Sequence, residues 1–289
     1  MPGGAIARMD ASGDIAFPVG TILSKTFYYP TPQRGGPAQV APATAAPELE
    51  RGRRLPLDGN VMIETRLLVH YADGWHAYPY VWNATQDEAW LEIAGDVQSL
   101  ELVSDSGSTD LTYIVPDANQ CANCHTPNHS SKALAPLGPQ GWQLNRPLTY
   151  DVGLRNQLDH WQVSGLLDAD MADWPDGVDW NDAAGTGIEP RAKAYLDANC
   201  AHCHNPAGAA DTSALNLELD APVDRRYGIC KTPVAVGRGS GDRPYDVYPG
   251  RPEDSILVFR MEHTDPAIAM PELGRSLVHA EGVELMRRW

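Results

Sequence analysis

The stretch Asp117-Ala-Asn-Gln-Cys-Ala-Asn-Cys-His125 recurs in shortened form as Asp197-Ala-Asn-Cys-Ala-His-Cys-His204. Both copies contain Cys-x-x-Cys-His, the pattern that attaches haem c. The spacing follows from the chemistry, because two thiols add across the haem vinyl groups and the next histidine supplies a nitrogen to the iron. Two such matches in one chain are not expected by chance. They predict two covalently bound haem c groups, one held by Cys121, Cys124 and His125 and the other by Cys200, Cys203 and His204.

Two other chemistries also use Cys-x-x-Cys pairs. A four-cysteine zinc site usually has its pairs about 15–20 residues apart, whereas these pairs begin at residues 121 and 200. A thioredoxin-like dithiol uses a single pair at the start of a helix. Neither chemistry explains the histidine that follows each pair. The fifth cysteine, Cys230, is expected to be a small buried side chain rather than a reactive thiol.

The composition is that of an acidic globular protein. The 289 residues include 22 Lys+Arg and 38 Asp+Glu, which gives a net charge of −16. This length suits two domains, each with its own core. The acidic charge argues against nucleic acid or an anionic membrane as the main partner, and no apolar run approaches the ~20 residues that span a bilayer. A basic redox partner would suit this charge, although solubility alone also explains it.

The N-terminal part is predicted to be rich in β-strands. Alternation along 63–71 places Ile63 and the other odd-numbered residues on one face, with Glu64 and Arg66 on the other. Ala72-Asp73-Gly74 then predicts the turn of a hairpin. Residues 30–56 are rich in Pro, Ala and Gly and are predicted to be an exposed loop. The expected strands cover residues 16–29, 63–71, 75–82, 90–93 and 111–115.

From Pro116 onward the pattern favours helices around the haem motifs. The predicted fold class is α+β, with a mainly α-helical, cytochrome c-like dihaem region following the β-rich module. Helices are expected over residues 154–167, 191–199 and 276–289. The predicted domains are a β-rich module over 1–115, a first haem unit with an acidic linker over 116–187, and a second haem unit over 188–289.

The sixth iron ligands are harder to assign. In the second unit Met270 follows His204 by a long loop and precedes the terminal helix, as expected of a methionine ligand that raises the potential of the haem. Met261 and His263 are rivals, and Met270 as an ordinary core residue is the remaining alternative. For the first haem, Met171, His160 and a third option, an upstream side chain or an open position, are equally favoured.

Attachment of haem c takes place outside the bacterial cytoplasm, so a periplasmic or extracellular protein is expected. Residues 1–10 contain no apolar segment of the kind found in signal peptides. The signal peptide is therefore expected to lie outside the given sequence.

The chain resembles a family of bacterial dihaem c-type cytochromes with a β-rich N-terminal module, and segments appended to some quinone-dependent sugar dehydrogenases are also similar. The resemblance implies two covalent haems, export and electron transfer. Chains of this family usually begin well upstream of residue 17, and the 30–56 insertion is longer here than usual. The stretches that carry the resemblance are Phe17–Phe27, Glu64–Leu68, Tyr80–Asn83, Ala118–His125, Leu137–Pro139, Gln143–Arg146, Asn156–Leu158, Arg191–Pro206, Val236–Gly241, Pro249–Leu257 and Met270–Ser276.

These observations predict an electron-transfer protein rather than an enzyme. It would carry electrons between extracytoplasmic redox partners, either alone or as a subunit of a larger redox assembly or filament. Aromatic residues of the β-rich module would then form a docking surface, or simply the core of a sheet. The alternative is a dihaem peroxidase-type enzyme, which needs one haem with an open sixth position and an acid–base residue beside it.

Overall fold

The computed structural model describes the chain apart from residues 33–35, 37, 43–58 and 170–173. The described residues divide into two units, each discontinuous in sequence. The first unit contains residues 1–121 and 138–177, and the second contains residues 122–137 and 178–289. The boundary at 177/178 falls inside the acidic stretch that the sequence predicts to be a linker.

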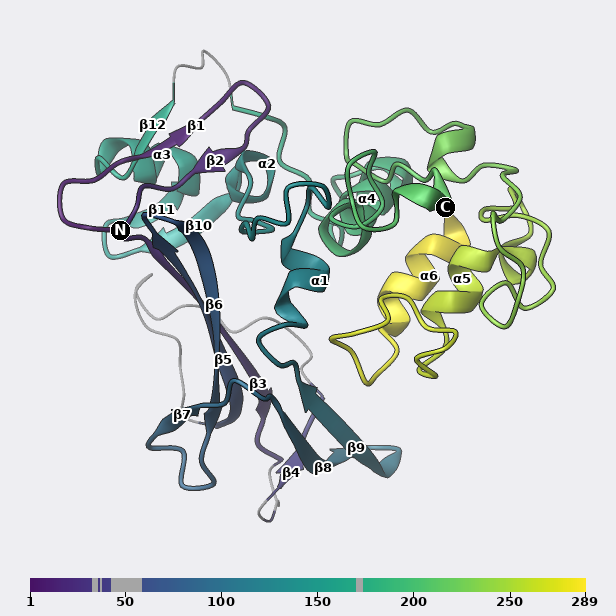
Figure 1. Ribbon diagram of the computed structural model, residues 1–289, viewed down its shortest axis with the longest axis horizontal. Coiled ribbons are helices and arrows are strands. Elements are labelled where there is room, and N and C mark those ends of the chain that lie inside the picture. Colours follow the sequence, from purple (N-terminus) through teal and green to yellow (C-terminus); the bar gives the residue numbers. More distant parts are fainter. Residues whose placement is uncertain (33–35, 37, 43–58, 170–173) are drawn as a thin grey trace. The chain divides into compact units, whose positions relative to one another are not determined.

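The first unit is built on the predicted hairpin. Strands β5 (Asn60–Tyr71) and β6 (Gly74–Trp82) pair antiparallel around the turn at Gly74, which confirms this element (Figure 1). They form the centre of a sheet in the order β3-β5-β6-β7, with β3 (Ile22–Pro30) and β7 (Ala89–Leu91) at its edges.

Three smaller sheets complete the strands of the first unit in the described residues. Strands β8 (Asp96–Ser104) and β9 (Gly107–Val115) form a second hairpin, and β4 (Gln39–Val40) joins β8 in parallel. Strand β1 (Ala7–Met9) pairs with β2 (Ile15–Ala16) and, in parallel, with β12 (Leu167–Ala169). Strands β10 (Pro147–Tyr150) and β11 (Gly153–Asn156) form a short hairpin.

The predicted loop over residues 30–56 lies mostly outside the described residues. In the part that is described, β4 forms a strand and Val40 is completely buried. The loop prediction is therefore wrong at this point, because pairing with the distant strand β8 supplies the backbone partners that the local sequence lacks.

Two short helices follow the first haem motif within the first unit, α2 (Gly141–Leu144) and α3 (Gln157–Val163). The predicted helix over 154–167 is too long, because Asn156 caps α3 by accepting hydrogen bonds from the main-chain N–H groups of Leu158 and Asp159. Leu154 belongs to β11 and is exposed, whereas Leu158 is fully buried in the core.

The second unit contains the remaining helices of the described chain. Helix α1 (Cys121–His125) begins at the last residue of the first unit, and α4 (Ile188–Leu196) leads into a π-helical turn over Asp197–Ala201. Helices α5 (Ile256–Met261) and α6 (Ala280–Arg288) lie side by side near the C-terminus (Figure 1).

Helices α4 and α6 pack closely in the core of the second unit. A side chain at Gly282 would overlap the phenol ring of Tyr195, so glycine is required at this crossing. Leu196, Val258 and Met286 are buried around it. The amphipathic terminal helix predicted from the sequence is thus confirmed as α6, which begins at Ala280.

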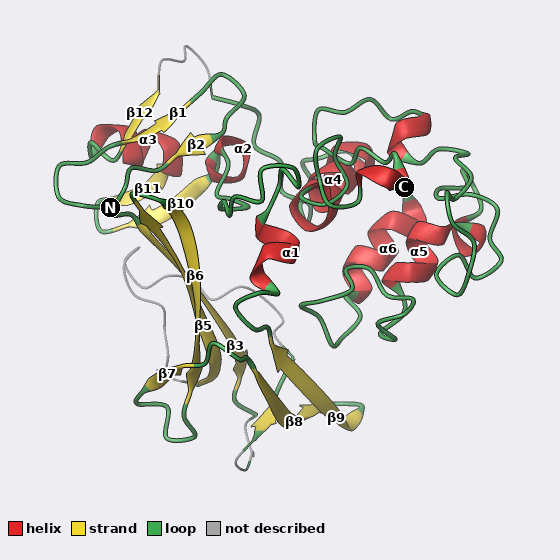
Figure 2. Ribbon diagram, viewed as in Figure 1, coloured by secondary structure: helices red, strands yellow, loops and turns green. Residues whose placement is uncertain are grey.

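The prediction of a mainly α-helical, cytochrome c-like region is wrong. Among the described residues after 116, the α-helices α1 to α6 have between four and nine residues each, and strands β10 to β12 lie between them. Turns and loops make up most of the second unit (Figure 2). Proline and glycine recur between residues 205 and 250, and they interrupt helices because proline lacks the N–H donor and glycine is flexible.

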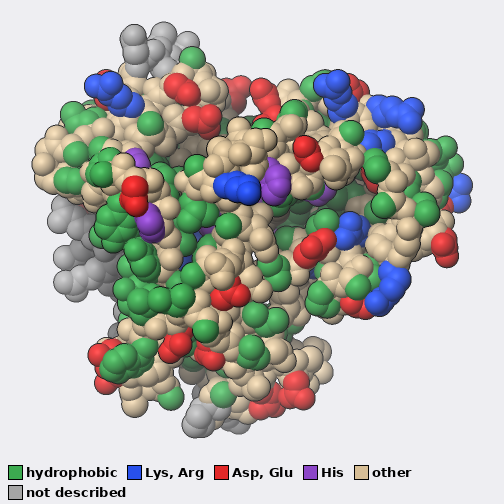
Figure 3. All heavy atoms as spheres, viewed as in Figure 1, with side chains coloured by type: hydrophobic (Ala, Val, Ile, Leu, Met, Phe, Trp, Pro, Cys, Tyr) green, Lys and Arg blue, Asp and Glu red, His purple; other side chains and the backbone are tan. Residues whose placement is uncertain are grey.

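No helix in the described part of the chain is long and apolar enough to cross a membrane. On the face shown in Figure 3, acidic side chains lie over both units, whereas Lys and Arg gather mainly over the second.

Candidate haem-binding site

The second Cys-x-x-Cys-His motif lies on a helical turn that continues α4. The main-chain N–H groups of Cys203 and His204 both donate to the carbonyl of Cys200, at 3.1 and 2.9 Å. This turn brings the two thiols to the same side, as residues three apart in a helix do. Asn205 is buried and fixes the end of the turn through hydrogen bonds to the carbonyl of Ala201 and the N–H of Ala207, both at 2.8 Å.

The imidazole of His204 is held in one tautomer. The Ser213 hydroxyl donates to the carbonyl of Ala210 at 2.7 Å, so Ser213 Oγ accepts a hydrogen bond from His204 Nδ1 at 3.1 Å. Burial, reinforced by the Arg260 guanidinium, lowers the pKa of His204 to about 4. A neutral imidazole with its proton on Nδ1 carries its lone pair on Nε2, which is the arrangement required of an iron ligand.

The first motif forms helix α1. The carboxylate of Asp117 accepts hydrogen bonds from the main-chain N–H groups of Asn119 and Gln120, at 2.7 and 2.8 Å, in the turn that leads into the helix. His125 Nδ1 lies 3.0 Å from the carbonyl oxygen of Ala135. Since a carbonyl only accepts, Nδ1 carries the proton, and His125 has the same tautomer as His204.

The second unit brings the two motifs together. Cys203 Sγ lies 3.4 Å from the carbonyl oxygen of Asn123, and the main-chain N–H of His129 donates to the carbonyl of Ala207 at 2.8 Å. Burial lowers the pKa of His202, and the nearby His125 adds to this shift. This proximity was not predicted from the sequence, in which the similarity of the two motifs was the only hint.

The thiols of the second motif are not activated as redox thiols are. None of the five cysteines forms a disulfide in the structure. Burial raises the pKa of Cys200 to about 12 and that of Cys203 to about 11, and in each case a neighbouring cysteine adds to the shift. A reactive dithiol has the opposite property, a lowered pKa. Among the described residues, no group of three or more His, Cys, Asp or Glu side chains is arranged to hold a bare metal ion.

A partly buried cation lies near the second motif and was missed by the sequence analysis. The Nη atoms of Arg275 donate to the main-chain carbonyls of Arg260, Met261 and His263, but its buried Nε has no hydrogen-bond partner. Its charge is close enough to Cys200 to alter the pKa of both groups. Haem carries two carboxylates, so a guanidinium with a buried and unsatisfied Nε–H fits the group that the motif predicts.

The candidate sixth ligands of the second haem lie in the same unit as His204. Met270 is partly buried in the loop between α5 and α6, and its N–H donates to the carbonyl of Arg260 at 3.2 Å. Met261 is buried in the core, and the Nδ1 of His263 lies 2.5 Å from the carbonyl oxygen of Phe259. Met270 therefore stays the predicted ligand.

The candidate sixth ligands of the first haem lie outside the second unit. His160 lies on α3 in the first unit, stacked on Tyr150, whereas His125 belongs to the second unit. Met171 lies outside the described residues.

The prediction that Cys230 is buried is wrong, since its side chain is exposed and its backbone has a φ of 50°.

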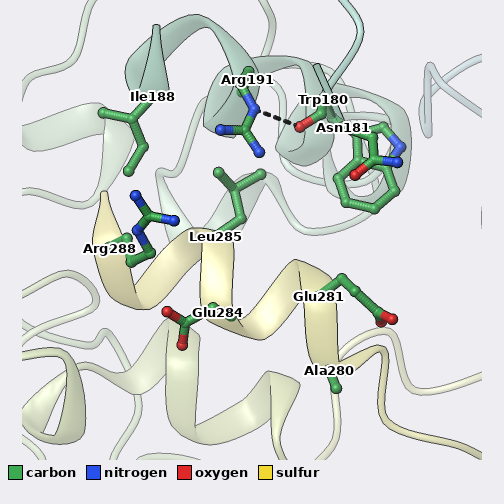
Figure 4. A pocket seen from close by; sticks show the side chains of 9 residues that line it. All are labelled: Trp180, Asn181, Ile188, Arg191, Ala280, Glu281, Glu284, Leu285 and Arg288. Carbon is green, nitrogen blue, oxygen red and sulfur yellow. Dashed lines mark hydrogen bonds between the residues drawn. The ribbon is translucent and has the colours of Figure 1, made fainter. Parts of the chain in front are cut away.

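A separate cavity of about 350 Å³ lies between α4 and α6. Figure 4 shows Leu285 pointing into it, with Arg191 above, where Arg191 Nε donates to the carbonyl of Trp180 at 2.7 Å. Glu284 and Arg288 lie at its edge. None of the six motif residues lines this cavity, so it is distinct from the haem motifs.

No family model, curated protein or solved structure matches this chain. The resemblance to dihaem cytochromes therefore rests on the residues quoted from the sequence.

Proposed function

We propose that the chain is a dihaem c-type cytochrome that carries electrons between redox partners outside the cytoplasm. The observation that carries the proposal is the pair of Cys-x-x-Cys-His motifs in which each histidine, His125 and His204, donates its Nδ1 proton to an oxygen of the protein. That hydrogen bond directs Nε2 toward a metal and increases the basicity of the ligand.

Each residue has a defined role in this proposal. Cys121 and Cys124 would tether one haem and Cys200 and Cys203 the other, with His125 and His204 as proximal ligands. Met270 is proposed as the distal ligand of the second haem. When bound, each haem supplies an iron that accepts and releases one electron.

The protein's own groups would hold the second haem in place and set its environment. Arg275 would place a positive charge beside the haem carboxylates, and the burial of His204 keeps its imidazole neutral at physiological pH. The net charge of −16 would guide a basic redox partner toward the surface. Export and a place in a larger redox assembly belong to the same proposal.

The proposal is tested by counting haems. The chain is produced with a signal peptide in a host that attaches haem c, and haem is quantified as the pyridine haemochrome. We expect two haems per chain, and one each in the Cys121→Ala/Cys124→Ala and Cys200→Ala/Cys203→Ala variants. Cys230→Ala is the matched control, because Cys230 is exposed and belongs to neither motif. A wild-type chain that folds without haem would refute the proposal.

Addition of carbon monoxide to the reduced protein distinguishes a carrier from the peroxidase-type alternative. Two six-coordinate haems would leave the spectrum unchanged. A shift in one haem would reveal an open sixth position and favour the enzyme.

A further inference from the structure

The cavity between α4 and α6 is lined by apolar side chains that belong to the core of the second unit. Leu285 of α6 is buried beneath it, and Ile188 of α4 packs against the same core. Trp180 lies at the other end of the cavity and packs against Tyr195 in a T-shaped arrangement, with the ring centroids 5.5 Å apart. The volume of about 350 Å³ falls within the range of small-molecule sites, about 300–1,000 Å³.

Two guanidinium groups extend into this cavity from the two helices. In Figure 4, Arg191 reaches into it from α4 and Arg288 reaches into it from the last turn of α6. Arg191 donates its Nε–H to the Trp180 carbonyl at 2.7 Å, which fixes the side chain, and no described residue accepts from its Nη groups. A guanidinium is always charged and has several N–H donors in one plane, so each group can bind a carboxylate.

The carboxylates around the cavity do not pair with these two guanidinium groups. Glu281 lies 3.6 Å from Nε2 of His279, and Figure 4 shows Glu281 and Glu284 pointing away from the space between the helices. Among the residues that the structure describes, no carboxylate forms an ion pair with Arg191 or Arg288. Other arginines of the second unit do have such partners, namely Arg287 with Glu262, Arg251 with Asp254 and Arg238 with Asp265.

Asp182 is the acidic residue that senses the charge of Arg191. Its carboxylate accepts hydrogen bonds from the main-chain N–H groups of Ala184 and Gly185, at 3.2 and 2.8 Å. The hydrogen bond from Gly185 is the first cause that lowers the pKa of Asp182, and the charge of Arg191 is the last. Asp182 is therefore held by its own turn, and the Nη groups of Arg191 stay available to a ligand.

We propose that this cavity binds a small organic anion that has one carboxylate and a flat apolar body. The carboxylate accepts hydrogen bonds from Arg191 and Arg288, and such charge-assisted bonds are stronger than neutral ones. The apolar body lies between Ile188 and Leu285, which point into the cavity from opposite helices, and its burial adds to the affinity. None of the six motif residues lines the cavity, so the inference goes beyond the proposed function and does not depend on it.

Binding at this place has a structural consequence. The ligand connects α4, which leads into the second motif, with α6, the helix at the C-terminus. Since the two arginines are brought together only when these helices pack, the folded chain binds the anion and the unfolded chain does not. The ligand is therefore expected to raise the midpoint temperature of unfolding.

Benzoate is the probe, because it combines a carboxylate with a flat apolar ring. Isothermal titration calorimetry on the full chain as isolated measures its affinity beside acetate, which lacks the ring, and benzamide, which lacks the charge. We expect benzoate to bind about tenfold more tightly than either, since it alone combines apolar burial with charge-assisted hydrogen bonds. Inorganic phosphate is titrated as well, and an affinity equal to that of benzoate would overturn the organic character of the site.

Three variants locate the binding. Arg288→Gln removes one charge from an exposed side chain and should weaken benzoate binding by about tenfold. Ala280→Trp fills the cavity from its exposed edge and should abolish binding. Arg226→Gln is the matched control, because Arg226 is an exposed arginine of the second unit that does not line the cavity, and it should bind benzoate like the wild type.

The outcomes are decisive for the site and separate from those for haem. Absence of saturable benzoate binding to the wild type would overturn the inference, and so would equal affinities in Arg288→Gln and Arg226→Gln. If Ala280→Trp does not fold, the comparison of the two glutamine variants still decides. A chain that contains no haem refutes the proposed function, whereas the benzoate titration tests the cavity in either case.

Discussion

Ser213 Oγ accepts a hydrogen bond from Nδ1 of His204 at 3.1 Å, while its own hydroxyl donates to the carbonyl of Ala210. The serine therefore acts as a fixed acceptor behind the proposed iron ligand. His125 has a main-chain carbonyl, that of Ala135, in the same position. A side-chain acceptor can be removed by substitution, whereas a main-chain acceptor cannot.

Ser213→Ala is predicted to raise the midpoint potential of the second haem. Loss of the acceptor makes the imidazole a poorer electron donor, which favours ferrous iron. The shift should not exceed about 60 mV, the equivalent of one hydrogen bond of about 1.4 kcal/mol. A redox titration measures both haems, and the first haem is the internal control. An unchanged or lowered potential of the second haem would contradict the assigned role of Ser213.

Arg275 is predicted to contribute separately to stability and to redox potential. Arg275→Gln should lose most of the hydrogen bonds to the carbonyls of Arg260, Met261 and His263, which should lower the free energy of unfolding by about 2–4 kcal/mol. It should also lower the potential of the second haem by removing a partly buried positive charge. Arg275→Lys should lower the free energy of unfolding by a similar amount, because lysine lacks the geometry of the guanidinium. It should leave the potential of the second haem unchanged, because lysine keeps the positive charge. Urea unfolding and redox titration measure the two effects. Equal potentials in the Gln and Lys variants would rule out the electrostatic role.

Glu64 is predicted to be essential for the stability of the first unit. It is fully buried, accepts hydrogen bonds from Arg66 and from the Tyr113 hydroxyl, and has no exposure to water. Glu64→Ala leaves Arg66 without its carboxylate partner and should lower the free energy of unfolding by about 3–5 kcal/mol. Replacing Glu64 and Arg66 together with methionine should cost less than Glu64→Ala alone. Chemical denaturation gives both values, and an equal or larger loss in the double variant would be against the ion-pair explanation.

Tyr227 is predicted to destabilise the fold at alkaline pH. Burial raises its pKa, so the folded state favours the neutral phenol and stability falls once the pH exceeds the unfolded value of about 10. Its buried hydroxyl has no hydrogen-bond partner in the structure, so Tyr227→Phe should cost little or nothing at pH 7. With the substitution, the free energy of unfolding should also fall less steeply between about pH 10 and 12. The matched control is the exposed Tyr71→Phe, and equal pH profiles for the two variants would refute the prediction.

The acidic surface is predicted to speed the reaction with a basic redox protein at low salt. The second-order rate constant measured by stopped flow should fall by about tenfold between 0.01 and 0.15 M ionic strength, because added salt shortens the Debye length and screens the attraction between the two proteins. An acidic carrier of similar potential is the control and should show no such fall. A flat response with the basic carrier would mean that the net charge of −16 serves solubility alone.

Several features could be predicted from the sequence because neighbouring residues determine them. Haem attachment at the two motifs is predicted from the spacing of the thiols and the histidine and stays a prediction. The β5–β6 hairpin follows from alternation around the turn at Gly74, and α6 follows from its apolar stripe. Each of these signals lies within a short segment, so the rest of the chain does not alter it.

Other features depend on residues far apart in the sequence. Alternation placed Glu64 on the polar face of its strand, but Tyr113 from the β8–β9 hairpin reaches it and buries it. Strand β12 pairs with β1, which lies at the other end of the first unit's sequence, and the mainly α-helical prediction was wrong. A periodic pattern describes which face is apolar but not which distant segment covers it.

The sequence by itself predicts haem attachment at each motif, because the prediction depends only on residue type and local spacing. Only the tertiary structure decided that Cys203 lies against Asn123 and that the charge of Arg275 lies near Cys200. Contacts of this kind form when chain folding brings distant segments together and buries their apolar surface. No local pattern encodes which two segments will meet.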